Sequence, residues 1–530
     1  MTETERKYEG TALPAGLEDL PGVRVSREAE QQDLDALYYD TPDLRLLQRG
    51  ITLRRRTGGT DVGWHTKLPL GADSRQELCI PLGGSGPQQV PAEFAVRLAA
   101  FTRGAALSPV ARLHTHRRRV QLLDGEERIL AEVTEDRVAA QAFDPAAVTS
   151  TGVRGSALPA AAEVATSTTV QASGWTEFEV ELKHGTPVLL EHTDAHFNAA
   201  GLTHSPWPSK LAHAFGFSRA APPGVGAAGR SGGARSAGEA VMHGIRTQAD
   251  RLLALDGAVR RGEEDSVHQM RITARRLRSL LKAHRRLFDT GRSAPLADEL
   301  RWLARLLGEA RDQEVLADKL VDALDAVPAP MREGALRGRI TEHYARTYKA
   351  AWQRAVAELD GARYFTLLDD LEAFAARPPL RSRARREAGD YLSRALRRQQ
   401  RRTLHRLDKA LDTAPGPARD KALHRARKAA KRARYTAEGA QHAVGHNTGK
   451  RLARYANRMK KLHKVLGDQH DSVVVRQELL GMSGQADAQH RHVFAYGVLH
   501  EVQRRTGEDA LERLSRLRRR AGGRKLTRIP

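Results

Sequence analysis

Residues 177–183 read EFEVELK, a run in which charged and apolar side chains alternate. Successive side chains of a β-strand point to opposite faces, so Glu177, Glu179 and Glu181 lie on one face, and Phe178 and Val180 lie on the other. The run therefore predicts a strand of a sheet that packs against a core on one face only. The three carboxylates then face either solvent or an enclosed polar space.

The same alternation recurs in other short segments of the first 220 residues. Arg54 and Arg56 share one face of the segment ITLRRR (51–56), and Arg55 lies on the other face. Any single pair of this kind suits a solvated sheet. Several strands with same-face charges of both signs instead favour a closed barrel, whose interior offers cations to phosphate oxygens and carboxylates to a hard divalent metal. The further same-face sets are Glu3, Glu5 and Lys7; Arg75 and Glu77; and Arg117 and Arg119.

The charge of the chain is unevenly distributed along its 530 residues. Residues 1–220 hold 23 Lys and Arg against 28 Asp and Glu, whereas residues 221–530 hold 64 against 36, so the net charges are −5 and +28. A chain of this length builds more than one hydrophobic core. The polycationic second half indicates a polyanionic partner, for which nucleic acid, anionic lipid and inorganic polyphosphate are the candidates.

Several classes of protein are excluded by features that the sequence lacks. No apolar run approaches the ~18 residues that cross a bilayer, and the first residues have neither the basic nor the apolar region of a signal peptide. We therefore expect a cytoplasmic protein with no membrane partner. The single cysteine, Cys79, excludes an internal disulfide and a thiolate metal site. The absence of a G-x-x-x-x-G-K-[ST] segment argues against a P-loop NTPase.

The composition also predicts where the domains begin and end. A Gly-, Ala- and Pro-rich stretch at 219–235 is typical of a flexible linker, and it separates a mostly β domain at 1–218 from a helical domain at 236–515. Within the first domain, residues 91–103 predict a helix, and the low-complexity stretch 141–173 predicts a long loop. The chain is expected to end in a basic, disordered tail at 516–530.

The helical half contains an internal repeat. The segment His268-Gln-Met-Arg271-Ile-Thr-Ala-Arg275-Arg276-Leu-Arg278 matches the segment from His424 to Arg434, 156 residues later. In each copy an LG-x-x-x-D segment follows, at Leu307–Asp312 and again 159 residues later at Leu466–Asp471. Nearly constant offsets predict a duplicated helical unit.

Each copy of the repeat carries a cationic stripe. At ~100° per residue, four side chains of the first copy fall within a stripe roughly 80° wide, namely those of His268, Arg271, Arg275 and Arg278. A solvated helix face mixes both signs of charge, whereas these segments hold almost no acids, so the stripes predict a binding surface. Asp312 and Asp471 are interpreted as structural partners of the basic helices. The predicted polyphosphate-binding residues are His268, Arg271, Arg275, Arg276, Arg278, His424, Arg427, Lys428, Lys431, Arg432 and Arg434.

Nucleic acid and membrane suit these stripes less well than inorganic polyphosphate. Aromatic residues make up 5% of the chain, and the basic helices hold almost none that could stack on bases or anchor in a bilayer. No RNA-recognition or zinc-finger motif is present. The sequence leaves the oligomeric state open.

The first half resembles the CYTH family, the triphosphate tunnel metalloenzymes. The motifs that carry the resemblance occur in the family's order: ExExK at residues 3–7, YYDTPDLRLLQRGITLRRR, TKLP, RQEL, EFEVELKHG and PSKLAHAF. The resemblance implies an antiparallel eight-stranded tunnel that binds a triphosphate and needs Mg²⁺ or Mn²⁺. Two departures are the long 141–173 stretch, and His114 and His116 where such proteins are richer in arginine.

The resemblance also implies roles for individual residues. Glu3, Glu5, Lys7 and Lys67 would be catalytic. Phosphate would be held by Arg54, Arg56, Arg75, Arg117, Arg119 and Lys210, with Lys7 and Lys67 beside them. Metal ligands would come from Glu132, Asp136, Glu177, Glu179 and Glu181.

The second half resembles the CHAD family of conserved-histidine α-helical domains, over about residues 236–515. The paired H-x-x-R-x-x-x-[RK]-R-x-R segments and the two LG-x-x-x-D segments carry this match. The resemblance implies two related helical bundles that bind inorganic polyphosphate.

Together these features predict a multidomain protein: an N-terminal α+β domain built as an antiparallel eight-stranded tunnel-like barrel, followed by an all-α domain of duplicated helical bundles. The predicted function is metal-dependent hydrolysis of inorganic triphosphate or a related triphosphate, with polyphosphate captured by the helices and the protein associated with polyphosphate granules. Two alternatives stay open. One is a non-catalytic polyphosphate-binding or targeting protein. The other is a different triphosphate chemistry, such as thiamine triphosphate hydrolysis or adenylate cyclisation.

Overall fold

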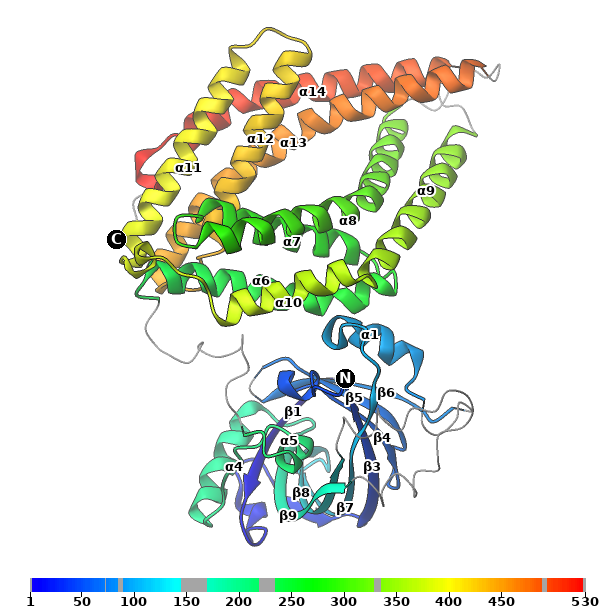
Figure 1. Ribbon diagram of the computed structural model, residues 1–530, viewed down its shortest axis with the longest axis vertical. Helices are drawn as coiled ribbons and strands as arrows, with labels where there is room; N and C mark the ends of the chain where they lie inside the picture. The colour runs from blue at the N-terminus through cyan, green and yellow to red at the C-terminus, as the bar shows by residue number, and fades with distance from the viewer. Residues whose placement is uncertain are drawn as a thin grey trace. The chain divides into compact units, whose positions relative to one another are not determined.

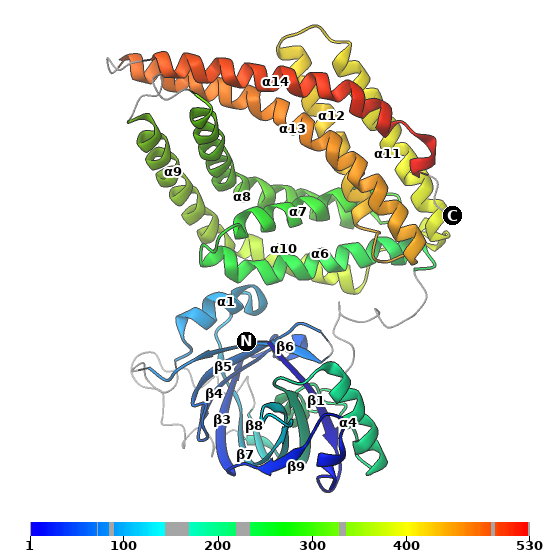
Figure 2. The ribbon, with the colours of Figure 1, turned by 180° about the vertical axis from the view of Figure 1, so that it is seen from behind.

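In the computed structural model the chain divides into two compact units, Met1–Gly226 and Ala227–Pro530 (Figures 1 and 2). The structure describes residues 2–71, 73–83, 89–143, 169–218, 234–327, 335–488 and 493–527. Among the helices of these residues, none is both long enough and apolar enough to cross a membrane. The predicted linker at 219–235 lies mostly outside the described residues.

The first unit is built from antiparallel strands, with three short or medium helices. Its elements are β1 (Thr2–Glu9), β2 (Val25–Glu28), β3 (Gln32–Asp40), β4 (Thr52–Thr57), β5 (Gly63–Pro69), β6 (Ser74–Ile80), α1 (Ala92–Thr102), β7 (Ser108–Leu123), β8 (Ile129–Phe143), β9 (Thr169–Leu182), α4 (Pro187–Ala199), β10 (Thr203–His204) and α5 (Lys210–Ala214).

Eight of the described strands close into a barrel in the order β1-β6-β5-β4-β3-β7-β8-β9, and β9 pairs back with β1. Closure depends on β1, whose residues Thr2–Thr4 pair with β6 and whose residues Glu5–Glu9 pair with β9. The two short strands β2 and β10 add to β7 and β1. The predicted eight-stranded antiparallel barrel is confirmed.

The hydrophobic core of this unit lies mainly outside the barrel. Phe94 and Leu98 of α1 pack with Leu53 and Trp64 on the outer face of β4 and β5. On the other side, Leu189, Leu190 and Phe197 of α4 pack with Tyr8, Phe178 and Val180 of β1 and β9. Because the apolar residues of each strand face these helices, strand alternation turns the charged residues inward.

The short helix α5 contacts the inner face of the barrel. Ser209 caps it by accepting a hydrogen bond from the Ala212 amide at 3.1 Å. Leu211, Ala212 and Ala214 then pack in one cluster with Ala36, Leu113 and Val138, which lie on the inner face of β3, β7 and β8. The helix thereby fixes Lys210, its first residue, at the edge of the charged interior.

Of two predicted stretches of this unit, one is confirmed and the other differs in the structure. The helix expected at 91–103 is α1, as predicted. The loop expected at 141–173 starts and finishes as strand, since β8 continues to Phe143 and β9 begins at Thr169. Residues 144–168 lie outside the described part of the chain.

The second unit is entirely helical in its long elements. These are α6 (Ala237–Arg260), α7 (Ser266–Ala283), α8 (Thr290–Asp325), α9 (Leu336–Leu359), α10 (Ala362–Ala376), α11 (Ala388–Leu411), α12 (Pro417–Glu438), α13 (His446–Ala488) and α14 (Phe494–Ala521).

The predicted duplication is visible in the order of these helices. The two histidine-containing segments are α7 and α12, and the two LG-x-x-x-D segments lie on α8 and α13. Both copies begin with a capped helix: Ser236 forms a capping box with Glu239, and the Glu387 side chain accepts from the amides of Gly389 and Asp390. Ser236 and Glu387 also pair with each other, so the copies start side by side.

The two copies contact each other at two places. Near their beginnings α6 packs on α11, and α7 packs on α12. Far along the chain, Leu320 and Leu324 of α8 and Ile340 of α9 form one apolar cluster with Leu479 of α13 and Leu499 of α14. Figures 1 and 2 show this meeting of α8, α9, α13 and α14 at the end away from α6.

The disordered tail expected at 516–530 is wrong for residues 516–527, which are ordered in the structure. The helix α14 continues to Ala521, and a 3-10 turn covers Arg524–Thr527. Gln400 of α11 donates to the Ala521 carbonyl at 2.7 Å, and Thr527 is buried. The basic composition of this segment is compatible with helix because its apolar residues contact α11 and α13.

Candidate functional site

The interior of the barrel is lined by charged side chains from every wall. Cross-strand pairing brings them into register: Glu3 lies opposite Arg75, Lys7 opposite Glu179, Lys67 opposite Glu77, and Arg117 opposite Asp136. Since directly paired residues project from the same face, these pairs are neighbours inside the tunnel. Buried charges of this number require mutual neutralisation or a charged ligand.

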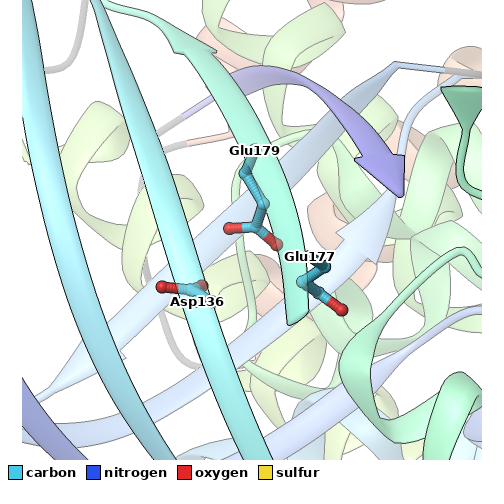
Figure 3. A group of neighbouring side chains, drawn as sticks. All are labelled: Asp136, Glu177 and Glu179. Carbon is cyan, nitrogen blue, oxygen red and sulfur yellow. The ribbon is translucent and has the colours of Figure 1, made fainter. Parts of the chain in front are cut away.

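Three carboxylates form a candidate metal site on two neighbouring strands. Oxygens of Asp136 on β8 and of Glu177 and Glu179 on β9 all lie within 4.8 Å of one another, and all three residues are buried (Figure 3). Trp175 donates its indole N–H to Glu177 at 2.7 Å and orients that carboxylate. Clustered carboxylate oxygens are the ligands that hard cations such as Mg²⁺ and Mn²⁺ prefer. The residues therefore fit a divalent metal, and we refer to them as the acidic triad.

The acidic triad is surrounded by cations. Lys210 Nζ lies 2.8 Å from Asp136, 2.7 Å from Glu177 and 2.8 Å from Glu179. Arg117 donates two hydrogen bonds to Asp136, at 2.7 and 2.5 Å, and Lys7 contacts Glu179. Burial alone would raise the pKa of Asp136 and of Glu179, but these cations outweigh it and hold each pKa below its usual range.

Two predicted metal ligands lie outside the acidic triad. Glu132 and Glu181 are cross-strand partners on β8 and β9, and Lys183 contacts them at 3.4 and 2.8 Å. Arg119, predicted to hold phosphate, lies 3.8 Å from Glu132. These four residues therefore form a separate charged group beside the acidic triad.

The opposite wall is predominantly cationic. Arg54 donates to the Tyr38 hydroxyl at 3.3 Å, and Arg56 is 4% exposed. Burial, followed by the neighbouring Arg54 and Arg117, lowers the pKa of Arg56 to about 9. Arg56 also forms an ion pair with Asp61. Arg55 instead pairs with Trp64, on the outer face that α1 covers.

The strand β1 lies between β6 on the cationic side and β9, which carries two residues of the acidic triad. Lys67 donates to Glu3 at 2.5 Å, and Glu3 also hydrogen-bonds Glu77. Burial and this second carboxyl raise the pKa of Glu3 to about 7, so the pair shares a proton near neutral pH. Glu5 contacts Lys7 and Arg75, at 3.5 and 3.6 Å. Burial opposes ionisation of Glu5, but Lys7, Lys67 and Arg75 lower its pKa to about 2.

Sequence reasoning left some tunnel residues out of the site. Glu77 appeared only as a same-face partner of Arg75, although its position in RQEL marks it as inward. His65, two residues before Lys67 on β5, hydrogen-bonds Glu77 at 3.1 Å. The sequence pattern did not place Tyr38 and Trp175 in the tunnel, because an aromatic residue on a strand usually belongs to the apolar face.

In the helical unit the two stripes face each other. Arg271 and Arg275 of α7 approach Arg427 and Lys431 of α12, and we call these four residues the cationic seam. Contrary to the sequence prediction of exposed stripes, all four are half-buried, because α7 packs on α12. Burial and the neighbouring arginines lower the pKa of Arg275 to about 10 and hold that of Lys431 well below its usual value.

The LG-x-x-x-D segments of α8 and α13 lie against the arginines of the cationic seam. A β-carbon at Gly308 would lie 3.3 Å from the Arg271 guanidinium, and one at Gly467 would lie 3.5 Å from Arg427 Nε. Glycine thus lets each arginine lie against the next helix. Asp312 accepts from Arg271 at 2.9 Å, as its structural role predicts. Among the described contacts, none joins Asp471 to Arg427, so the two copies are not equivalent.

The other predicted stripe residues separate into smaller groups. Arg276 and Arg434 both reach Glu438, at 3.6 and 2.6 Å, and both lie over the Tyr435 ring. Arg278 and Arg432 lie near further arginines of α8 and α11, and Lys428 is exposed. The Nε atoms of Arg271, Arg276, Arg278 and Arg427 are buried and have no hydrogen-bond partner among the described residues.

The histidines of the second copy join the cationic seam. The rings of His424 and His470 lie 4.3 Å apart and are tilted by 46°. His463 on α13 faces Arg427, Lys431, Arg434 and Arg275. Burial and these cations lower the pKa of His424 to about 4 and that of His463 to about 2. His268 of the first copy faces Arg311 instead. His463 was missed in the sequence, although it precedes Gly467 by one helical turn.

Comparison with known proteins now identifies the family. The CYTH domain model matches residues 1–214 and the CHAD domain model matches residues 243–480. The chain is also 36% identical over 526 residues to the Mycobacterium tuberculosis proteins named uncharacterized protein MT2285 (strain CDC 1551 / Oshkosh) and Rv2226 (strain ATCC 25618 / H37Rv), covering 97% of this chain and 94% of each relative. The chain belongs to the CYTH–CHAD family.

The two resemblances seen in the sequence are thus confirmed, in the same order. Solved structures resemble single parts of the chain. The CHAD domain from the plant Ricinus communis is 23% identical, covers 54% of this chain and 93% of its own length, and has a TM-score of 0.44. PptA from Streptomyces chartreusis is 20% identical over 54% and 99%, with a TM-score of 0.43. HpAC1 from Hippeastrum, titled a putative adenylyl cyclase with a dominant triphosphatase activity, is 14% identical over 40% and 95%, with a TM-score of 0.24.

One departure from the CYTH pattern has a simple place in the structure. His114 and His116 alternate with Arg117 and point to the outer face, where they contact Asp35 and Asp33 at 3.6 and 2.9 Å. They are half exposed, at 52% and 47%. His114 and His116 therefore do not line the tunnel interior of this CYTH domain.

Proposed function

We propose that the CYTH domain hydrolyses inorganic triphosphate, or a related triphosphate compound, with Mg²⁺ or Mn²⁺, and that the CHAD domain binds inorganic polyphosphate. The observation that supports the first part is the pairing of a buried acidic triad with a cationic wall across one tunnel. A triphosphate needs both, because its charge must be neutralised before water can attack phosphorus.

The chain's own residues have distinct tasks in this proposal. Arg54, Arg56, Lys67 and Arg75, on the adjacent strands β4, β5 and β6, bind nonbridging oxygens from one side, while Lys7, Arg117, Arg119 and Lys210 bind from the other. Glu3, with its pKa of about 7, is the carboxyl that exchanges a proton during the reaction, and Glu5 holds Lys7 and Arg75 in place. A metal held by Asp136, Glu177 and Glu179 would offset phosphate charge and activate water.

The decisive experiment is a panel of substrates. Phosphate release from tripolyphosphate, ATP, thiamine triphosphate and long-chain polyphosphate is measured with Mg²⁺ and with Mn²⁺. Fastest release from tripolyphosphate supports the proposal, and a faster reaction of thiamine triphosphate assigns the tunnel to that substrate. Pyrophosphate and cyclic AMP formed from ATP would indicate cyclisation. No release from any compound, with polyphosphate still bound, would identify a binding protein.

The CHAD part of the proposal is supported by the half-buried cationic seam. The four cations of the seam repel one another, and the Nε atoms of two of them, Arg271 and Arg427, have no hydrogen-bond partner among the described residues. Phosphate oxygens would therefore stabilise the seam by offsetting its charge and accepting these hydrogen bonds. The seam lacks exposed aromatic residues that read bases, which favours a phosphate chain over nucleic acid. We extend the proposal to the domain limits 1–218 and 236–515 with a linker between them, and to a cytoplasmic location at polyphosphate granules.

Substitution of Arg54 or Arg56 by Ala should weaken substrate binding by about 1.5–3 kcal/mol, the range for a hydrogen bond to a charged group. Arg55→Ala is the matched control on the same strand, and it should change KM little, because its side chain faces Trp64 and α1. KM for tripolyphosphate measures the difference. Equal effects of all three substitutions would show that the strand does not present Arg54 and Arg56 to the substrate.

Polyphosphate should bind more tightly as the pH falls from 7 to 5. The pKa of His424 is about 4 and that of His463 about 2 in the free protein, so both are neutral at pH 7. A bound polyanion stabilises their charged forms and raises both pKa values, so binding takes up protons and affinity rises at lower pH, by up to about tenfold per unit for each proton.

The same pH change should destabilise the protein when polyphosphate is absent. Histidines of the unfolded chain have a pKa of about 6.5 and bind protons more readily than the folded ones, so stability falls below that pH.

Titration calorimetry in two buffers of different ionisation enthalpy counts the protons that are taken up when polyphosphate binds. Replacing His424 and His463 by Asn should remove the uptake, whereas uptake unchanged in this variant would contradict the assignment.

A further inference from the structure

The Lys210 ammonium occupies the centre of the acidic triad. It contacts all three carboxylates at 2.7–2.8 Å, and its side chain is 9% exposed. A single positive charge thus neutralises part of a site built from three negative ones.

This ammonium and a divalent cation compete for the same oxygens. The three carboxylate oxygens lie within 4.8 Å of one another, so a cation that contacts them all must be where Lys210 Nζ is. Two cations a few ångströms apart in a buried site repel each other strongly. Metal binding therefore requires the ammonium to leave.

Lys210 is placed so that its ammonium can leave without unfolding the site. The residue is the first of α5, and the Ser209 cap and the apolar contacts of Leu211 and Ala212 hold the backbone there. Its four-carbon stem has several rotatable bonds. Arg117 and Lys7 keep their own contacts with Asp136 and Glu179, and Trp175 still donates to Glu177, so each carboxylate keeps a partner.

We propose that Lys210 is an internal cation that holds the acidic triad when no metal is bound, and that its ammonium transfers to a phosphate oxygen when a divalent metal and a phosphoanhydride enter together. This inference rests on the proposed function of the tunnel. Its consequence is cooperativity: metal alone binds weakly, because it must displace the ammonium with no phosphate to receive it. By reciprocity, each ligand strengthens the binding of the other.

The test is the affinity of the full chain for Mn²⁺ without phosphate, measured by electron paramagnetic resonance of the free ion. Lys210→Met removes the competing charge and should tighten Mn²⁺ binding by about tenfold or more. Lys183→Met is the matched control, because Lys183 pairs with Glu181 and Glu132 outside the triad, and it should leave Mn²⁺ affinity unchanged. Equal or weaker Mn²⁺ binding by Lys210→Met would overturn the proposal.

A second measurement needs no variant. Acetylation of Lys210 in the wild-type chain, followed by mass spectrometry and expressed relative to Lys183, should rise several-fold when Mg²⁺ is added, because the displaced ammonium loses its carboxylate partners. Unchanged acetylation under saturating Mg²⁺ would also overturn the proposal. Neither readout depends on turnover. A chain that hydrolyses nothing but shows both effects would therefore refute the hydrolase and leave the role of Lys210 standing.

Discussion

Replacing Glu177 and Glu179 together by Gln should lower metal-dependent turnover by about 1000-fold or more, the scale on which removal of charge-stabilising groups acts. Gln keeps the shape of each side chain but supplies no anionic oxygen, so the acidic triad retains only Asp136 as a charged ligand. Phosphate release from tripolyphosphate across a range of Mg²⁺ and Mn²⁺ concentrations measures the loss.

Glu181→Gln provides the control on the same strand. Glu181 contacts Lys183 and lies outside the acidic triad, so its substitution should cost far less than that of Glu177 and Glu179. Circular dichroism establishes that each variant is folded, and the glutamine carbonyls can still accept hydrogen bonds from Lys210. A folded double variant with undiminished turnover would show that the metal is held elsewhere or is not needed.

Replacing all four residues of the cationic seam by Ala should weaken polyphosphate binding of the full chain by more than about 100-fold. Each lost charge removes a phosphate contact and one released counterion, so the salt dependence of binding should also become shallower. The substitutions remove cations that repel one another in a half-buried interface. Stability should therefore be retained or increased, in contrast to the usual result of removing buried groups.

A control variant with the same change in net charge distinguishes binding at the cationic seam from the general attraction of a polyanion to a positively charged domain. Arg285, Arg286, Lys421 and Arg425 are exposed residues at or near the same two helices, and their replacement by Ala should affect binding only slightly. Affinity for polyphosphate, and competition by duplex DNA or RNA with phosphate groups matched at about physiological salt, are measured for both variants. Equal losses in the two variants, or a preference for nucleic acid, would contradict the assignment to the seam.

Much of the barrel could be predicted because strand alternation is a local property. In EFEVELK the period of two assigns Glu177, Glu179 and Glu181 to one face before any partner strand is known. The same rule separated Arg55 from Arg54 and Arg56. Alternation does not tell which residues of one strand face lie close together in the folded protein. For this reason Glu132 and Glu181 were grouped with the acidic triad, although the structure places them beside Lys183.

In the helical unit, periodicity predicted the stripes but misjudged their exposure. A helical wheel shows which residues share a face, and it carries no information about the second helix that covers this face. The packing of α7 on α12 turned two surface stripes into one half-buried seam, and it brought in His463 from α13. Burial is the first cause of the pKa shifts of Lys431 and His463, and both residues also face Arg275 of α7, so these shifts depend on the packing of the helices.

The sequence by itself determined the family, the two-domain order, the strand faces and the duplicated basic helices, because each depends on residues close together in the chain. Only the tertiary structure decided which charges meet. Closure of the barrel by β1 and β9 brought the ExExK strand against the acidic strand, and α5 then placed Lys210, some thirty residues after Glu179 in the chain, inside the acidic triad. Coulomb interactions act over a few ångströms whatever the sequence separation, so the chemistry of this site depends on contacts that only folding creates.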